Sequence, residues 1–171
     1  MLDYYSRYII AWKLRSTMRA GDVTETLDVV LVASGYDHAH VRHKPRLLSD
    51  NGPSYIAGEV VDYIEVNRMS YVHGAPFYAQ TQGKIERPIQ SGHQTLKNHT
   101  PLENYFLPGG LENQIRAFVE HYNHQRNHES LSKVTPADAY FGRAEAIIKQ
   151  RERAKRKTIQ HRGLQHSKLA A

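Results

Sequence analysis

The sequence contains no cysteine, which excludes disulfide bonds and thiolate zinc sites and fits a reducing compartment. It also has no apolar run of about 18 residues and no signal-peptide pattern, so we expect a soluble, cytoplasmic protein that does not enter a membrane. No internal repeat is visible. These absences leave a globular intracellular domain as the simplest expectation.

Positive charge is concentrated at the carboxyl end of the chain. The whole chain of 171 residues has a net charge of +6, and residues 143–171 carry nine Lys and Arg against two Glu, which is 9 − 2 = +7. Such a tail attracts polyanions, of which nucleic acid is the commonest in a cytosol, although a solvated helix without a specific partner is the alternative. We therefore predict a core domain over residues 1–142 and a basic helical tail over 143–171.

Hydrophobic periodicity predicts alternating strands and helices in the first half of the chain. The expected elements are a strand over 8–14, a helix capped by Asp22 and ended by Gly35, a strand over 46–49, a helix from Pro53 to about Asn67, and a strand over 69–73. This order argues for an α/β sheet whose ligand sites lie beyond the carboxyl ends of the strands. Asp50 follows such an end.

The second half reads as mainly helical. The expected elements are a helix from about Gln82 that is kinked or broken at Pro88, a loop over 102–110, a helix over 111–126, a short helix from Thr135-Pro136 to Tyr140 closed by Gly142, and a basic helix over 144–157 with a frayed end from Arg162.

Two groups of histidines invite a metal interpretation, namely His38, His40 and His43, and His121, His124 and His128. Neither group has a cysteine or an evident carboxylate partner nearby, which structural metal sites usually need. A polar loop is the better interpretation of the first group. Packing or phosphate-facing roles are the better interpretation of the second.

Two carboxylates stand in distinctive surroundings. Asp50 lies in Ser49-Asp50-Asn51-Gly52, and Glu86 lies in Gln80-Thr81-Gln82-Gly83-Lys84-Ile85-Glu86-Arg87, with 35 residues between the two acids. Hard divalent cations prefer carboxylate oxygens, and a site that exchanges phosphodiester bonds usually gathers several acids around two ions. Asp50 and Glu86 are therefore the candidate catalytic and metal-binding residues.

These motifs closely resemble the retroviral-type integrase core of the IS3-family insertion-sequence transposases. Asp3 to Ile10 resembles that family's second-to-third strand hairpin, and Tyr122-Asn123-x2-Arg126-x-His128 through Thr135-Pro136-Ala137 resembles its carboxyl-terminal signature. The resemblance implies an α/β, RNase H-like fold followed by carboxyl-terminal helices. It also implies strand transfer of insertion-sequence DNA by a DDE site with two Mg²⁺ (or Mn²⁺) ions, Asp50 being the second acid and Glu86 the third.

The resemblance also implies partners. We expect binding to insertion-sequence ends and target DNA, a homo-oligomer assembled on the DNA, and association with the nucleoid. The candidate DNA-binding residues are Asn51, Lys84, Arg87, Arg126, Lys155, Arg156 and Lys157.

Two departures from the family pattern predict that this chain alone is inactive. The family's first Asp lies upstream of the segment that matches Asp3, so the fold is expected to be incomplete at the amino terminus. Pro88 to Gly92 looks like an insertion that would interrupt the helix carrying Glu86. Two alternatives follow: a non-catalytic DNA-binding remnant, and the unfolded product of a decayed transposase gene.

Overall fold

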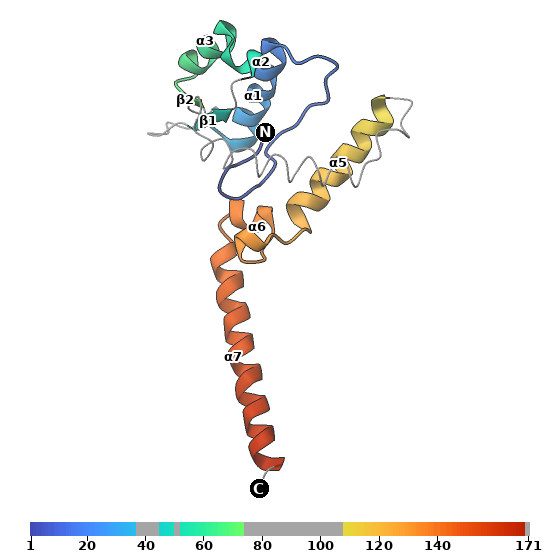
Figure 1. The fold of residues 1–171 in the computed structure, drawn as a ribbon, viewed down its shortest axis with the longest axis vertical. Coiled ribbons are helices and arrows are strands. Elements are labelled where there is room, and N and C mark those ends of the chain that lie inside the picture. Colours follow the sequence, from blue (N-terminus) through green and yellow to red (C-terminus); the bar gives the residue numbers. More distant parts are fainter. Residues whose placement is uncertain (37–44, 50–51, 74–107, 170–171) are drawn as a thin grey trace. The chain divides into compact units, whose positions relative to one another are not determined.

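The computed structural model describes residues 1–36, 45–49, 52–73 and 108–169. These residues form two compact units (Figure 1). Unit 1 comprises Met1–Tyr4 and Ile9–Phe118, and unit 2 comprises Tyr5–Tyr8 and Val119–Ala171. Within the described ranges, no helix combines the length and the apolar character needed to cross a membrane.

Unit 1 is built around a strand–helix–strand arrangement. Strand β1 (Arg46–Ser49) leads through helices α2 (Pro53–Ile56) and α3 (Gly58–Val66) to strand β2 (Ser70–His73). The two strands are parallel, with Arg46 opposite Ser70 and Ser49 opposite His73. Both predicted strands are confirmed to within one residue, and the predicted α/β alternation is confirmed for this segment.

The core of unit 1 lies between α1 (Ala20–Ser34) and α3. Val23 and Leu27 of α1 pack with Val60 and Ile64 of α3, and all four are at most 5% exposed. Tyr63 of α3 donates a hydrogen bond to the carboxylate of Asp28 on α1. Burial and this hydrogen bond raise the pKa of the Tyr63 hydroxyl, so a polar contact reinforces the apolar seam between the two helices.

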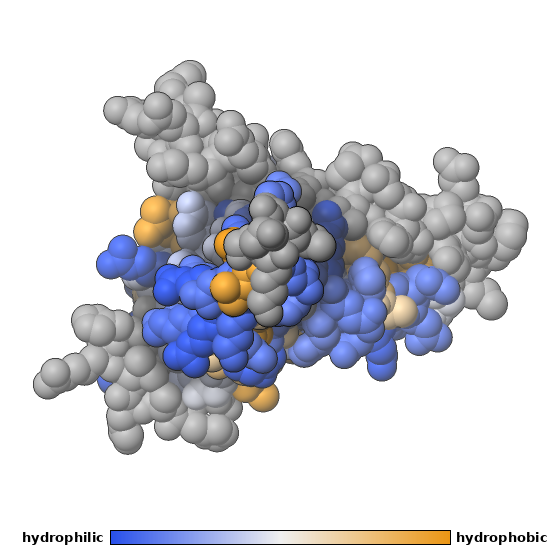
Figure 2. All heavy atoms as spheres, turned by 90° about the horizontal axis from the view of Figure 1, so that it is seen from below, coloured by the Kyte–Doolittle hydropathy of each residue, from blue (hydrophilic) through white to orange (hydrophobic). Residues whose placement is uncertain are grey.

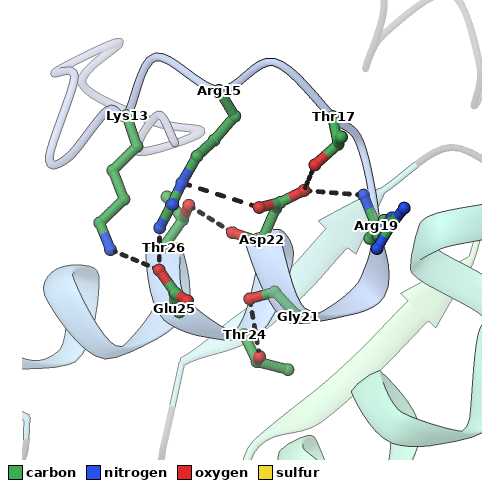
Figure 3. Close-up of polar contacts among 9 residues, drawn as sticks. All are labelled: Lys13, Arg15, Thr17, Arg19, Gly21, Asp22, Thr24, Glu25 and Thr26. Atoms are coloured by element: carbon green, nitrogen blue, oxygen red, sulfur yellow. Dashed lines mark hydrogen bonds and ion pairs between the residues drawn. The ribbon is translucent and has the colours of Figure 1, made fainter.

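The first turn of α1 differs from the predicted cap. The helix begins at Ala20 with Arg19 as its N-cap, and Asp22 is the third helical residue. Its carboxylate accepts hydrogen bonds from the Arg19 backbone N–H at 2.9 Å and from the Thr17 hydroxyl at 2.7 Å (Figure 3). Asp22 thus caps the helix from inside its first turn, where a negative charge also favours the helix dipole.

The far end of α1 matches the sequence. Gly35 adopts a left-handed conformation with φ of 72°, and the Tyr36 N–H reaches back to the Leu31 carbonyl at 3.0 Å. Glycine tolerates this conformation without strain, so the predicted stop at Gly35 is confirmed.

The predicted strand over residues 8–14 is wrong. That segment has a single antiparallel bridge, between Leu2 and Ile9, and is otherwise irregular. Arg7 has a positive φ of 63°, and Tyr8 packs with Tyr140 in unit 2 instead of continuing a strand face with Ile10. The bridge across the turn over residues 4–6 does agree with the hairpin that the family resemblance implies.

The single helix predicted from Pro53 to about Asn67 is also wrong. Ala57 is extended, with ψ of 139°, and separates α2 from α3. Ile56, which the periodicity placed on the buried stripe, is 54% exposed. The break precedes Gly58, a residue type that weakens a helix interior because it loses more backbone freedom on folding.

The described helices of the carboxyl-terminal half are α5 (Pro108–His124), the 3₁₀ turn η2 (Glu129–Leu131), α6 (Pro136–Tyr140) and α7 (Ala144–Leu169). Residues 108–110, predicted as loop, belong to α5, where Pro108 opens the first turn without needing a backbone N–H. The predicted fraying from Arg162 is wrong, because α7 continues to Leu169. The helices expected between residues 82 and 98 lie outside the described residues.

Candidate functional site

The predicted catalytic centre falls outside the described residues. This applies to Asp50, Asn51, Lys84, Glu86 and Arg87. It applies equally to the segment Pro88–Gly92 and to the histidines 38, 40 and 43. The structure does describe the sheet edge that leads into this centre: β1 and β2 end side by side at Ser49 and His73, and Asp50 is the next residue in the sequence after Ser49.

A chain of hydroxyl groups holds the carboxyl end of β1. The Tyr71 hydroxyl of β2 donates to the Tyr55 carbonyl of α2 at 2.6 Å, and it lies 2.7 Å from the Ser49 hydroxyl of β1. A phenol has one proton, so Ser49 is the donor to Tyr71. Ser49 is only 5% exposed. These contacts tie two strands and a helix together immediately before Asp50, a role that the sequence pattern had not revealed.

The described histidines make separate contacts. His121 Nδ1 lies 3.1 Å from Gln125 Oε1, His124 Nε2 lies 3.9 Å from Glu120 Oε1, and the His128 ring packs edge-on against Tyr122. Across the described ranges, no three His, Asp or Glu side chains are grouped so that they could hold a metal ion.

Arg126 belongs to an aromatic and cationic cluster in unit 2. Its guanidinium lies 5.8 Å from the ring centre of Tyr122, which is only 3% exposed. Burial raises the pKa of the Tyr122 hydroxyl, against the opposing influence of the positive charges of Arg126 and Arg7. The residues of the Tyr122–His128 motif therefore come together in space, as expected of a functional or structural signature.

His128 sits in the same cluster and is held neutral. Burial lowers the pKa of its imidazole, and the charges of Arg126 and Arg7 lower it further. Its Nε2 atom is buried and has no hydrogen-bond partner among the described residues. Protonation there would add a charge and an N–H group beside two guanidinium groups, which is unfavourable.

We therefore expect unit 2 to lose stability in mild acid. The unfolded chain protonates His128 near its ordinary pKa of 6.5, and the folded chain does so only at lower pH. Just below pH 6.5 the unfolded state thus binds more protons, and the free energy of unfolding decreases as the pH falls. Urea unfolding of unit 2 between about pH 7 and 5 should show this dependence.

The matched variants are His128→Gln and His161→Gln. His161 is exposed on α7. The first substitution should flatten the pH dependence, and the second should leave it unchanged. An equal pH dependence in the His128→Gln protein would refute this assignment.

The junction before α7 is fixed by polar and aromatic contacts. Thr135 caps α6 by accepting the Asp138 N–H at 3.1 Å, and Arg143 Nε lies 3.0 Å from Asp138 Oδ1. Although burial alone would raise it, the pKa of Asp138 is lowered because Thr135 and Arg143 donate hydrogen bonds to the carboxylate. Tyr8 stacks on Tyr140 with ring centres 4.6 Å apart. Sequence reasoning predicted the Thr135 cap but missed the Tyr8 contact, for which no local signal exists.

Helix α7 presents unneutralised positive charge. Every residue from Arg151 to His166 is exposed. In Figure 2, which is seen from below Figure 1, most of the coloured residues are hydrophilic. Five cations on this helix form no ion pair with any described carboxylate: Arg153, Lys155, Arg156, Lys157 and Arg162. Cations without internal partners are the groups that release counterions when they bind phosphates.

Comparison with known proteins places the fold. The family model described as "Integrase core domain" matches residues 67–136. The Gag-Pro-Pol polyprotein of mouse mammary tumor virus (strain BR6) is 25% identical over 122 residues, which is 71% of this chain and 6% of that polyprotein. The chain thus spans a small fraction of the curated relative that it matches.

Solved structures of integrases are similar in fold. The catalytic core domain of BIV integrase superposes with a TM-score of 0.51 at 18% identity, covering 80% of each chain. The HTLV-2 integrase catalytic core domain in complex with magnesium gives 0.53 at 18% identity, covering 80% of this chain and 79% of that one. The simian T-cell lymphotropic virus intasome in complex with PP2A regulatory subunit B56 gamma gives 0.55 at 17% identity, covering 72% and 41%.

The chain has the RNase H-like fold of integrase catalytic cores. The predicted fold class is thereby confirmed. The narrower assignment to the IS3 family, the division at residue 142 and the roles of the seven candidate DNA-binding residues stay predictions.

Proposed function

We propose that this protein acts in DNA integration, as the catalytic core of an IS3-type transposase. The observation that carries the proposal is the shared edge at which β1 and β2 end, with Ser49 opposite His73 and Asp50 next in the sequence. In α/β sheets, ligands bind beyond the carboxyl ends of the strands. The similarity to integrase cores in sequence and fold supports the same conclusion.

The proposed chemistry assigns separate tasks to the acids and the cations. Asp50 and Glu86 would hold Mg²⁺ or Mn²⁺, which would activate the attacking oxygen and stabilise the leaving one in phosphodiester exchange. Carboxylates suit these hard cations, and both residues lie outside the described part of the chain. Asn51, Lys84 and Arg87 would orient the DNA backbone beside them.

The remaining predicted DNA-binding residues are in unit 2. Arg126 would present its guanidinium from the aromatic cluster around Tyr122, and Lys155, Arg156 and Lys157 would supply positive potential along α7. The expected partners are insertion-sequence ends and target DNA, bound by a homo-oligomer. One of the similar solved structures is a viral intasome, and this supports an assembled state on DNA.

The proposal is tested by strand transfer with the purified full chain. Labelled duplexes ending in candidate element sequences are incubated with plasmid DNA and Mg²⁺ or Mn²⁺. Joined products should appear with either metal and disappear on chelation by EDTA, because the ions supply the chemistry. Their appearance would also refute the prediction from sequence that this chain alone is inactive. Nicked or degraded plasmid without joined product would indicate a contaminating nuclease and would count against the proposal.

A second candidate function is DNA binding without catalysis. It is favoured by the five α7 cations that pair with no described carboxylate, because these need neither Asp50 nor Glu86 to act. Salt-sensitive DNA binding without strand transfer under any metal condition would support this function and refute the first.

A further inference from the structure

We propose that α7 lies in the major groove of duplex DNA, with a row of cations on each flank contacting one of the two phosphate strands and an uncharged face between them directed at the base edges. This inference shares with the proposed function only the expectation that DNA is a partner. It requires neither metal nor the residues at the sheet edge.

Four of the eight cations of α7 form two rows on nearly opposite sides of the helix. At about 100° per residue, Arg153 and Lys157 lie about 40° apart on one side. Lys155 and Arg162 lie about 20° apart on the other, and the centres of the two rows are separated by about 170°. All four side chains are exposed and have no ion pair with any residue that the structure describes. Two opposite rows of cations can contact the phosphates of both DNA strands, whereas a single row could contact only one strand.

The two faces between the rows differ in charge. Over residues 153–166, one is uncharged and consists of small or polar residues: Ala154, Thr158, His161 and Gln165. The opposite face carries both acids of the helix, Glu145 and Glu152, together with Arg156 and with Lys149, which is paired with Glu145. With the uncharged face toward the DNA, both carboxylates point away from the phosphates, which removes the repulsion that the reverse orientation would create.

The dimensions agree with this placement. An α-helix with its side chains is about 10–12 Å across, and the major groove of B-DNA is about 12 Å wide. The exposed stretch from Lys155 to His166 spans about 18 Å at a rise of about 1.5 Å per residue, which corresponds to about five base pairs.

The uncharged face has the chemistry of base recognition. Glutamine side chains can pair with the N6 and N7 positions of adenine, and methyl groups contact the thymine methyl. The Thr158 hydroxyl donates to the Ala154 carbonyl at 3.0 Å, which leaves its methyl group as the outward contact. We therefore expect a preference for sites containing adenine and thymine.

The base of α7 is anchored in unit 2, so the helix is presented as a fixed projection. Arg151 Nη1 donates to the Lys133 carbonyl at 2.7 Å, and Arg143, the residue before α7, places its Nε 3.0 Å from Asp138 Oδ1 of α6. Preorganisation of this kind lowers the ordering cost of binding.

The test compares three charge-removing variants of α7: Lys155→Gln, Lys157→Gln and Lys149→Gln. Lys155 and Lys157 belong to the two rows, whereas Lys149 is paired with Glu145 about 145° from the centre of the uncharged face and serves as the matched control. Affinity of the full-length protein for a 20-base-pair duplex is measured in EDTA over a series of salt concentrations. Far-UV circular dichroism verifies that helix content is unchanged.

Each row substitution should reduce the magnitude of the salt slope by about 0.9, the value for one lost phosphate contact. The Lys149→Gln slope should stay near that of the parent. Equal losses in all three variants would overturn the proposal in favour of diffuse attraction, and equal affinity for single-stranded DNA would overturn it as well.

A second measurement isolates the base-facing side. Selection of bound sites from random duplexes should yield an enriched motif of about five base pairs, and His161→Ala with Gln165→Ala should erase that motif while leaving the salt slope intact. Absence of any motif in the parent protein would contradict base recognition. These outcomes are independent of strand transfer, so the groove proposal and the catalytic proposal can fail separately.

Discussion

Replacing Glu86 by glutamine is expected to reduce strand transfer by on the order of a thousandfold, because a lost metal ligand removes several kcal/mol of transition-state stabilisation. Glutamine keeps the size of the side chain and removes only its negative charge. Asp50→Asn should have an effect of similar size. The double variant should be little worse than either single one, because ligands of one metal site act as a unit.

The control for this prediction is Glu112→Gln. Glu112 is exposed on α5 and lies 3.7 Å from Arg116, an exposed pair of small energetic weight. Transfer by this variant should match the parent. Mn²⁺ binding, followed by electron paramagnetic resonance, gives a readout that does not depend on activity: it should weaken in Glu86→Gln and Asp50→Asn only. Unchanged Mn²⁺ binding in both would remove these residues from the proposed site.

Leu27→Ala is expected to destabilise unit 1 by about 2–5 kcal/mol, the usual cost of emptying a leucine site in a packed core. Leu27 is 1% exposed and packs with Val60, which is fully buried, and with Ile64 of α3. The substitution leaves a cavity on the seam that joins α1 to the strand–helix–strand unit. Because a domain of this size is stabilised by only about 5–15 kcal/mol in total, the variant should unfold at clearly lower urea concentration.

Val32→Ala is the matched change on the same helix. Val32 is 66% exposed, so its truncation should alter the free energy of unfolding by no more than about 0.5 kcal/mol. Urea unfolding followed by circular dichroism measures both variants, with the denaturant slope as a test that the unfolding transition is comparable. Similar midpoints for the two variants would show that the α1–α3 seam does not carry the stability of unit 1.

The features that the sequence predicted differ from those that it missed in how far apart in the sequence the interacting residues lie. Strands β1 and β2, the stop at Gly35 and the cap at Thr135 were predicted because each depends on residues within a few positions of one another. Asp22 was predicted as the N-cap but is the third residue of the helix, because an acid can cap a helix from either position. Local chemistry permits both, and the surrounding contacts select one.

The candidate site divides in a similar way. The sequence motifs that contain Asp50 and Glu86 indicated an integrase core without any information on packing. The observed fold is similar to that of integrase catalytic cores. No pattern within the sequence indicated that Tyr71 would hold the end of β1 through Ser49, because this depends on the register of two strands and the position of α2.

By itself, the sequence determined the α/β class, the boundaries of the two strands and the basic character of the tail, since periodicity, turn residues and charge act over short distances. Only the tertiary structure decided that Tyr8 would leave its expected strand to stack on Tyr140, and that Ala57 would divide a helix. The physical reason is that contacts between distant residues gain their free energy from burial and ring packing, which local propensity does not encode.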